Sequence, residues 1–170
     1  PNGRTLQIME HRTPDGGMVI TYSDVTDMRR ARAEIETLAF YDPLTGLPNR
    51  RLLLDRLGQA TERAQRSGQL GALLFLDLDH FKTLNDTRGH EIGDELLLQV
   101  AQRLSASVRS ADTVARLGGD EFVIMLCDLS SGAVEAAAQA RRVAEKLLRA
   151  LDQPYILQGH KHQSTGSVGA

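Results

Sequence analysis

The first residues of the chain alternate between apolar and polar side chains, which is the pattern of β-structure. Residues 5–9 and 18–22 each form such a run. Between them, the Pro-Asp-Gly-Gly sequence at 14–17 is a strong turn signal. We therefore expect a β-hairpin within residues 1–26. Two strands bury too little apolar surface to be stable by themselves, so this hairpin is not expected to fold alone.

From residue 27 to residue 40 the apolar period becomes that of a helix. The apolar positions are spaced 3, 4 and 3 residues apart, at Met28, Ala31, Ile35 and Leu38. This spacing is the a/d seam of a coiled coil, although a single amphipathic helix packed on its own domain would have the same pattern. Because Pro43 disfavours helical geometry in the residue before it, we expect Asp42 to be a hinge.

The rest of the chain alternates helices with strands. The pattern predicts helices over residues 50–67, from the 87–94 segment to about 108, and over 132–151. It predicts strands over residues 70–79, 113–117, 122–126, 154–157 and 163–170. Asn49 is expected to cap the first of these helices. The strand at 70–79 is a near-continuous apolar run, which predicts a central strand buried on both faces.

Two glycines separate the predicted strands at 113–117 and 122–126. Gly118 and Gly119 supply the positive φ angles of a tight two-residue loop, and their missing side chains let a bulky anion approach the backbone. Asp120 and Glu121 follow directly. Carboxylates beside a phosphate are unfavourable unless a divalent cation lies between them. This stretch by itself also fits a surface hairpin with solvated acids.

Composition narrows the class of protein. The 170 residues are enough for one well-packed domain with an additional segment attached to it. They are 41% hydrophobic and 25% charged, which is ordinary for a soluble globular protein. A net charge of −2 excludes the basic field that non-specific nucleic-acid binding requires. With one cysteine and no apolar run near 18 residues, we expect a cytoplasmic protein without an intramolecular disulfide. The start at Pro1 suggests a fragment.

Further carboxylates end the predicted central strand. Asp77 and Asp79 project to the same side, which is costly unless they are paired, hydrogen-bonded or bound to a metal. Asp79 has an alternative role as a cap for the turn that follows, whereas Asp77 has none. A strand-end Asp77 facing Asp120, with Lys82 nearby, would supply the charge neutralisation that phosphoryl transfer needs.

Polar residues also lie around the start of the helix that ends near 108. His90 and Asp94 are four residues apart and share a face if the first turn is helical. Asp94 would equally serve as a helix cap. Together with Asn85, it would also suit a purine edge, because a carboxylate accepts from the N–H groups of guanine. Farther along, Arg109 and Asp112 have the spacing of a local ion pair.

Five successive segments, DPLTGLPNR, DLDHFKTLND, GHEIGDELL, RSAD and RLGGDEF, resemble the signatures of the GGDEF domain family, the diguanylate cyclases. The resemblance runs from about Tyr41 to Ala170. It implies an α+β fold, the nucleotidyl-cyclase palm, with a ferredoxin-like βαββαβ mixed sheet and flanking helices. It also implies a nucleotidyltransferase that uses Mg²⁺ or Mn²⁺ and works as a homodimer. Such an enzyme condenses two GTP into cyclic di-GMP and releases two pyrophosphates.

The resemblance also implies roles for individual residues. It places the metal ion on Asp77, the carbonyl of Leu78 and Asp120. It makes Asp120 the acceptor of the 3′-hydroxyl proton and Lys82 the residue that neutralises phosphate charge. The residues implied in GTP binding are Asn85, His90, Asp94, Gly118 and Gly119, with Asn85 and Asp94 on the guanine. Arg109 and Asp112 match the R-x-x-D of the inhibitory site for the product, cyclic di-GMP.

Both ends of the chain resemble parts of larger proteins. The pattern NGR…PDGGMVITYSDVT resembles the closing hairpin of a PAS sensor domain. We therefore expect a partial PAS-like domain at 1–26, a signalling helix at 27–40 and the cyclase domain at 41–170. The ending LDQPYILQGHKHQSTGSVGA resembles GGDEF domains that precede an EAL phosphodiesterase domain.

Two expectations follow from the C-terminal end. The family continues past Ser167-Val168-Gly169 into a further helix and a K-x-x-G-R-like ending, whose basic side chains hold the GTP phosphates and are absent from this sequence. This departure leaves open whether the chain is active in isolation. The alternative function is a catalytically silent module that binds GTP or cyclic di-GMP and regulates a downstream EAL domain.

Overall fold

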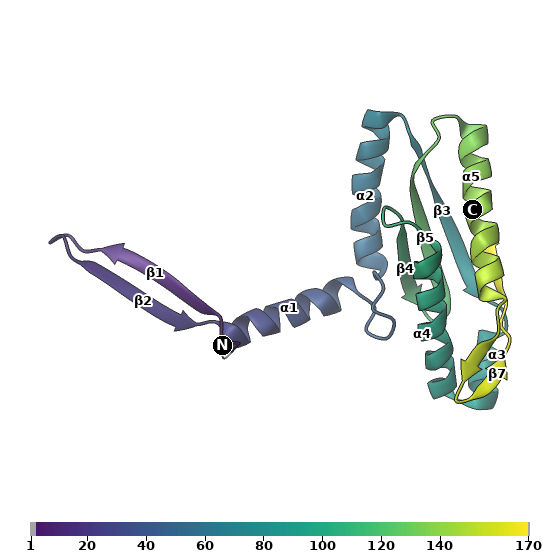
Figure 1. Cartoon of the computed structure of the whole chain (residues 1–170), viewed down its shortest axis with the longest axis horizontal. Helices are drawn as coiled ribbons and strands as arrows, with labels where there is room; N and C mark the ends of the chain where they lie inside the picture. The colour runs from purple at the N-terminus through teal and green to yellow at the C-terminus, as the bar shows by residue number, and fades with distance from the viewer. Residues whose placement is uncertain (1–2, 170) are drawn as a thin grey trace. The chain divides into compact units, whose positions relative to one another are not determined.

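The computed structural model describes residues 3–169, apart from the side chains of residues 32–34 and 36. The chain divides into two compact units, Pro1–Ala39 and Phe40–Ala170, which are described separately (Figure 1). No helix in the described part of the chain is long and apolar enough to cross a membrane.

The first unit consists of a hairpin followed by a helix. Strands β1 (Leu6–Arg12) and β2 (Met18–Asp24) pair antiparallel, as predicted, and helix α1 (Thr26–Phe40) follows. Apolar side chains on the two strands are exposed to solvent, and so are Met28, Ile35 and Leu38 of the predicted seam, which are each more than 60% exposed. The seam is therefore available for contacts outside its own helix.

The second unit is built on a four-stranded sheet. Its strands are β3 (Leu70–Leu78), β4 (Thr113–Gly118), β5 (Glu121–Leu129) and β8 (Gly166–Gly169), in the order β4-β5-β3-β8. Helices α3 (Phe81–Arg88) and α4 (His90–Ser107) connect β3 to β4, and α5 (Ala133–Leu151) follows β5. The predicted α+β fold of βαββαβ order is confirmed, and its described strand pairings are all antiparallel rather than mixed.

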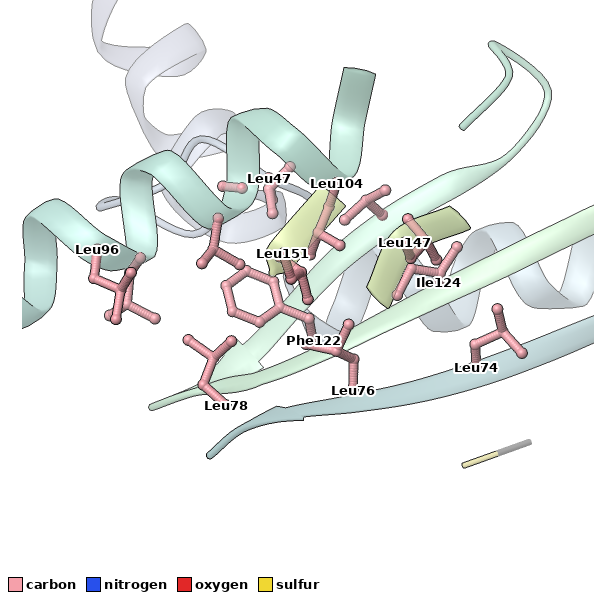
Figure 2. Close-up of a cluster of buried hydrophobic side chains, with 14 of the residues drawn as sticks. Leu47, Leu74, Leu76, Leu78, Leu96, Leu104, Phe122, Ile124, Leu147 and Leu151 are labelled. Atoms are coloured by element: carbon pink, nitrogen blue, oxygen red, sulfur yellow. The ribbon is translucent and has the colours of Figure 1, made fainter. Parts of the chain in front are cut away.

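The two faces of the sheet are covered by different helices (Figure 1). Alternate residues of each strand point to opposite faces, so one set packs against α4 and α5 and forms the main core. Figure 2 shows side chains of this core, including Leu74, Leu76, Leu78, Phe122, Ile124, Leu96, Leu104, Leu147 and Leu151. The other set packs against α2 (Arg50–Ser67) through Leu53. Asn49 caps α2 as predicted, accepting from the amides of Arg51 and Leu52.

The expectation that β3 is buried on both faces was wrong. Leu74, Leu76 and Leu78 are buried, whereas Phe75 is 54% exposed and Asp77 is exposed. On that second face α2 packs against Leu73 and leaves the later part of the strand open. A continuous apolar run cannot distinguish a strand covered along its whole length from one covered over only half of it.

The C-terminal segment forms its own small hairpin before it enters the main sheet. Strand β6 (Tyr155–Leu157) pairs with β7 (His160–His162), a strand that the sequence pattern did not predict. Arg103 of α4 holds this region in place. Its guanidinium lies 3.7 Å from the centroid of the Tyr155 ring and donates to the carbonyls of Ala150, Gln153 and Pro154.

An ion pair between Asp42 and Arg116 connects the loop before α2 to the β4–β5 hairpin. Asp42 Oδ1 accepts from Arg116 Nη1 at 2.9 Å and from the amide and hydroxyl of Thr45 at 2.8 and 2.6 Å. Arg116 also donates to the carbonyl oxygen of Gly119 at 2.9 and 2.7 Å. The two charged side chains are only 16% and 10% exposed. The loop, the ion pair and the glycine turn therefore form one connected network.

The charge of Asp42 is stabilised in this network. Burial acts to raise the pKa of Asp42, but the hydrogen bonds from Thr45 and the Arg116 guanidinium outweigh burial and hold it below its usual value. Helix α1 ends at Phe40, two residues before Asp42, so the helix stops ahead of Pro43 as expected. Whether Asp42 acts as a hinge stays a prediction.

We expect Asp42→Asn to lower the free energy of unfolding of the second unit by about 1–3 kcal/mol at pH 7, because it leaves Arg116 partly buried without its partner. Because the pKa of Asp42 is lower in the folded protein than its value near 3.8 in the unfolded chain, the Asp42 carboxylate stabilises the fold above that value. This stabilisation is lost as the pH falls through the pKa of Asp42 in the folded protein. The difference from wild type should therefore shrink by pH 3. Urea denaturation at the two pH values measures it.

A matched control for this substitution is Glu145→Gln, which removes an exposed ion pair with Arg141 on α5. Its effect should stay within about 0.5 kcal/mol. An Asp42→Asn loss of the same size at pH 3 and pH 7 would show that the charge of Asp42 is not the source of the stabilisation.

Candidate active site at the β4–β5 hairpin

The hairpin between β4 and β5 turns on two residues, Gly119 and Asp120. Gly118 pairs with Glu121, so the loop lies one residue later than the predicted Gly118-Gly119 pair. Both glycines have positive φ angles, 148° for Gly118 and 52° for Gly119, as the sequence predicted. These angles favour glycine, and no heavy atom lies within 4 Å of where a Cβ would be at either position. The backbone of the turn is therefore open on its outer side.

Carboxylates gather at the ends of β3 and β5. Leu76 pairs with Phe122, and continuing this register by one residue brings Asp77 level with Glu121 on the same face. Partial burial raises the pKa of Asp77, and the negative charges of Asp120, Glu121 and Asp79 raise it further. None of the ion pairs formed within residues 3–169 involves these four acids. The arrangement therefore favours the approach of a cation.

The donors present at this position fit a hard divalent cation. No group of three His, Cys, Asp or Glu side chains among the described residues is arranged to hold a metal by itself. Mg²⁺ does not need such a cage, because it commonly takes one or two carboxylates and fills its other positions with water and substrate phosphate. Asp77, Asp120 and the carbonyl of Leu78 would provide that partial set. The Leu78 side chain is buried, so only its backbone is available.

Asp79 has a structural role that differs from the capping role suggested by the sequence. Its carboxylate accepts from the hydroxyls of Thr165 at 2.6 Å and Ser167 at 2.9 Å, and these hydrogen bonds lower its pKa. Helix α3 is instead preceded by His80, which has a φ of 61° and makes no side-chain capping bond. Asp79 therefore joins the end of β3 to β8.

The candidate nucleotide-binding residues Lys82, Asn85, His90 and Asp94 lie where α3 meets α4. Lys82 and Asn85 belong to α3, and α4 begins at His90, so His90 and Asp94 share a helical face as predicted. Gly89 occupies the cap position of α4 and no side chain caps it, which excludes the capping role for Asp94. Lys82, His90 and Asp94 are exposed. No hydrogen bond or ion pair within the described residues joins this group to the hairpin acids.

The corner between α4 and β4 forms a second polar site. The Asp112 carboxylate accepts from the backbone amides of Arg109 at 3.1 Å and Cys127 at 3.2 Å. The described side chains show no ion pair between Arg109 and Asp112, so the predicted local pair does not form. The hydrogen bonds of Asp112 instead hold the backbone of the corner, and Arg109 is exposed.

A cavity of about 390 Å³ lies beside this corner, lined by Arg109, Asp112, Arg142 and Lys146 among others. The sequence analysis missed Arg142 and Lys146. Their spacing of four residues on α5 placed them on one face, but nothing in the local pattern showed that this face meets the Arg109 corner. The cavity brings three cationic side chains to one place, beside the carboxylates of Asp112 and Asp128. Arg142 pairs with Glu135 at 2.9 Å and Lys146 donates to the carbonyl of Ser107 at 2.8 Å, whereas Arg109 is in none of the ion pairs among the described residues and can meet an anionic ligand.

Comparison with known proteins agrees with this architecture. Residues 39–170 match the family model described as diguanylate cyclase, GGDEF domain, and residues 1–33 match a PAS fold model. The bifunctional diguanylate cyclase/cyclic di-GMP phosphodiesterase MucR of Pseudomonas aeruginosa is 46% identical over 144 residues, which are 85% of this chain and 20% of MucR. The chain thus spans about a fifth of the length of the curated relatives it matches.

Two solved structures extend the comparison. The GGDEF domain of TpbB (YfiN) from Pseudomonas aeruginosa has a TM-score of 0.71 and 38% identity, covering 76% of this chain and 73% of that one. The coiled coil and GGDEF domain of DgcB from Caulobacter crescentus, in complex with c-di-GMP, has a TM-score of 0.73 and 28% identity, covering 85% and 75%. Because the family model covers most of its length, this chain belongs to the GGDEF family of diguanylate cyclase domains.

Proposed function

We propose that this chain carries the cyclase domain of a diguanylate cyclase, which condenses two GTP into cyclic di-GMP and two pyrophosphates. The observation that carries the proposal is the cluster of Asp77, Asp120 and Glu121 beside an open glycine turn, with the pKa of Asp77 raised by burial and by its neighbours' charges. Such a cluster suits a nucleoside triphosphate with its divalent cation. The similarity to GGDEF domains supports the same reaction.

In the proposed mechanism each domain holds one GTP, so two domains face each other as a homodimer. Asp77, Asp120 and the Leu78 carbonyl hold Mg²⁺ or Mn²⁺, which when bound supplies positive charge to the phosphates. Asp120 accepts the proton of the 3′-hydroxyl. The 3′-oxygen then forms a bond to the α-phosphorus of the opposing GTP, and the bond to the pyrophosphate oxygen breaks.

Other residues of the chain position the substrate. Lys82 offsets the negative charge that builds up on the phosphoryl group, and the exposed backbone at Gly118 and Gly119 lies against the phosphates. Asn85, His90 and Asp94 hold the nucleoside, with Asn85 and Asp94 on the guanine. Arg109 and Asp112 form the inhibitory site for cyclic di-GMP, where Arg142 and Lys146 add positive charge. GTP is an intracellular nucleotide, so we propose a cytoplasmic location for this domain.

We further propose three functional segments: the end of a PAS-like sensor at 1–26, a signalling helix at 27–40 and the cyclase domain at 41–170. The match of residues 1–33 to a PAS fold supports the sensor. The exposed apolar seam of α1 supports a coiled coil between two copies. In such a dimer the seam would set how two GTP sites face each other.

A second candidate function is a catalytically silent module that binds GTP or cyclic di-GMP and regulates a downstream EAL domain. Its specific support is the similarity to the cyclic di-GMP phosphodiesterase NbdA of Pseudomonas aeruginosa, 37% identical over 145 residues, whose name describes a phosphodiesterase and no cyclase. The presence of Asp77, Lys82 and the complete Gly-Gly-Asp-Glu-Phe sequence favours the enzyme.

Asp120→Asn should abolish synthesis of cyclic di-GMP, because it removes both a metal ligand and the proton acceptor. We expect a loss of at least about a thousandfold in turnover by full-length protein supplied with GTP and Mg²⁺, with the product measured by chromatography. The unfolding curve should stay close to that of wild type. Asp55→Asn on α2, where Asp55 contacts Gln59, is the control and should leave turnover unchanged.

Two results would contradict this proposal in different ways. Turnover by Asp120→Asn close to the wild-type rate would overturn the assignment of Asp120. A folded wild-type dimer that binds GTP but makes no cyclic di-GMP would reject the enzyme and favour the silent module.

Arg109→Ala should weaken the binding of cyclic di-GMP by roughly 10- to 100-fold, the range expected for losing charge-assisted hydrogen bonds. GTP binding should be unchanged, because Arg109 lies at the α4–β4 corner and not at the glycine turn. Calorimetry with each nucleotide measures the two affinities. The control is Arg141→Ala, which removes a different exposed arginine, one that lies on α5. Unchanged product affinity in Arg109→Ala would remove this site from the proposal.

Insertions between residues 28 and 38 test the signalling helix. Three or four added residues shift the seam to the wrong face and should change cyclase activity, whereas seven restore the heptad phase and should largely restore activity. Activity of the full-length protein, with its dimerisation followed by light scattering, gives the readout. Activity indifferent to the phase of the insertion would support a passive spacer that packs on its own domain.

A further inference from the structure

Gly93 lies at a close contact between α3 and α4. A Cβ at this position would stand 1.9 Å from Asn85 Oδ1, 2.9 Å from Asn85 Cγ and 3.3 Å from Cζ of Phe81. Real side chains do not tolerate contacts shorter than 3.0 Å, so one of these groups would have to move. Asn85 can occupy its present position only because residue 93 lacks a side chain.

The reason for glycine here is space and not backbone conformation. Gly93 is buried inside α4 and is not among the glycines with positive φ. Phe81 is 8% exposed and belongs to the main core, so it has little freedom to move. Asn85 is only half-buried and ends in a short rotatable amide. A side chain at residue 93 would therefore displace the Asn85 amide.

The Asn85 amide has a defined orientation in this contact. Its Oδ1 is buried against Gly93, and no group among the described residues donates a hydrogen bond to it. The amide NH₂ is consequently the end left to meet a ligand, and it is a donor. Asp94, the next residue after Gly93, is exposed and presents an acceptor.

We propose that Gly93 is a positioning residue for base recognition, which admits the Asn85 amide against α4 so that its NH₂ and the Asp94 carboxylate read one purine edge together. This inference rests on the proposed function in taking GTP as the ligand. The donor matches O6 of guanine, and the acceptor matches the neighbouring N–H groups. Adenine carries a donor at position 6, which opposes the amide NH₂. The pair therefore selects guanine.

Gly93→Ala in full-length protein tests the proposal. We expect the Kd and KM for GTP to rise roughly tenfold, the usual effect of losing one substrate hydrogen bond, and the preference for GTP over ATP to fall. Turnover at saturating GTP should change much less, since the metal-binding acids are untouched. The unfolding midpoint should change little, because the Asn85 side chain can rotate away and the helix preference of alanine offsets the close contact with Phe81 Cζ.

Gly58→Ala is the matched control. Gly58 also lies within a helix, α2, but a Cβ there would meet nothing within 4 Å. Neither nucleotide affinity nor base preference should change in this variant. Unchanged GTP affinity in Gly93→Ala, or an equal change in Gly58→Ala, would overturn the proposal.

A double-mutant cycle shows whether Gly93 acts through Asn85. Once Asn85→Ala has removed the amide, adding Gly93→Ala should weaken GTP binding little further. An undiminished effect in the Asn85→Ala background would mean that Gly93 serves only helix packing, and the proposal would be withdrawn.

A nucleotide-free measurement separates this inference from the proposed enzyme activity. Nuclear Overhauser effects between the side-chain amide protons of Asn85 and the α-protons of Gly93 should be present in wild type. The signals of this side-chain amide should shift in Gly93→Ala. Absence of the Overhauser effects in wild type overturns the inference whatever the protein catalyses. If they are present and GTP affinity responds as expected, but no cyclic di-GMP forms, only the proposed enzyme activity fails.

Discussion

The pairing register of β3 with β5, fixed by the hydrophobic core, is the constraint that brings the carboxylates of the site together. Asp77 comes level with Glu121 because Leu76 pairs with Phe122, and both of those side chains are buried in the main core. A shift of one residue would turn Leu76 and Phe122 out of the core. The hydrophobic core thus holds the acids together, and the raised pKa of Asp77 is the electrostatic consequence.

The surrounding polar contacts hold the two segments that carry these acids. Asp79 is tied to Thr165 and Ser167, which joins the end of β3 to β8. Arg116 holds the carbonyl of Gly119 and is itself held by Asp42. These contacts lie on the sheet and its adjoining loops, and the Arg116 side chain that makes two of them is only 10% exposed. The acids of the site are therefore positioned before any ligand is present, which lowers the conformational cost of binding.

The network of Asp42 also gives the start of the second unit a physical connection to the glycine turn. Asp42 follows α1 by two residues, and one arginine links it to the backbone of Gly119. The loop before α2 and the glycine turn are therefore joined through a single arginine.

The sequence alone determined much of this protein. Apolar periodicity and turn residues identified the first hairpin, α1, α2, α4 and α5, because these patterns depend on neighbours a few residues apart. The βαββαβ order followed from short motifs and their similarity to a family. The roles of Asp77, Asp120, Asn85 and Asp94 come from the same motifs and stay predictions. The positive φ angles of Gly118 and Gly119 were also predictable, since only local backbone sterics require them.

Tertiary structure decided what depends on residues distant in the sequence. Whether Phe75 is covered depends on where α2 ends its contact with the sheet, and the role of Asp79 depends on two hydroxyls more than 80 residues away. The partners of Asp42 and Asp112, and the approach of Arg142 and Lys146 to Arg109, arise only when separate elements pack. Gly93 shows the same limit, because its neighbour Asn85 belongs to another helix. Local patterns record periodicity and turn chemistry, whereas the identity of a contact across elements is set by the packing of the whole unit.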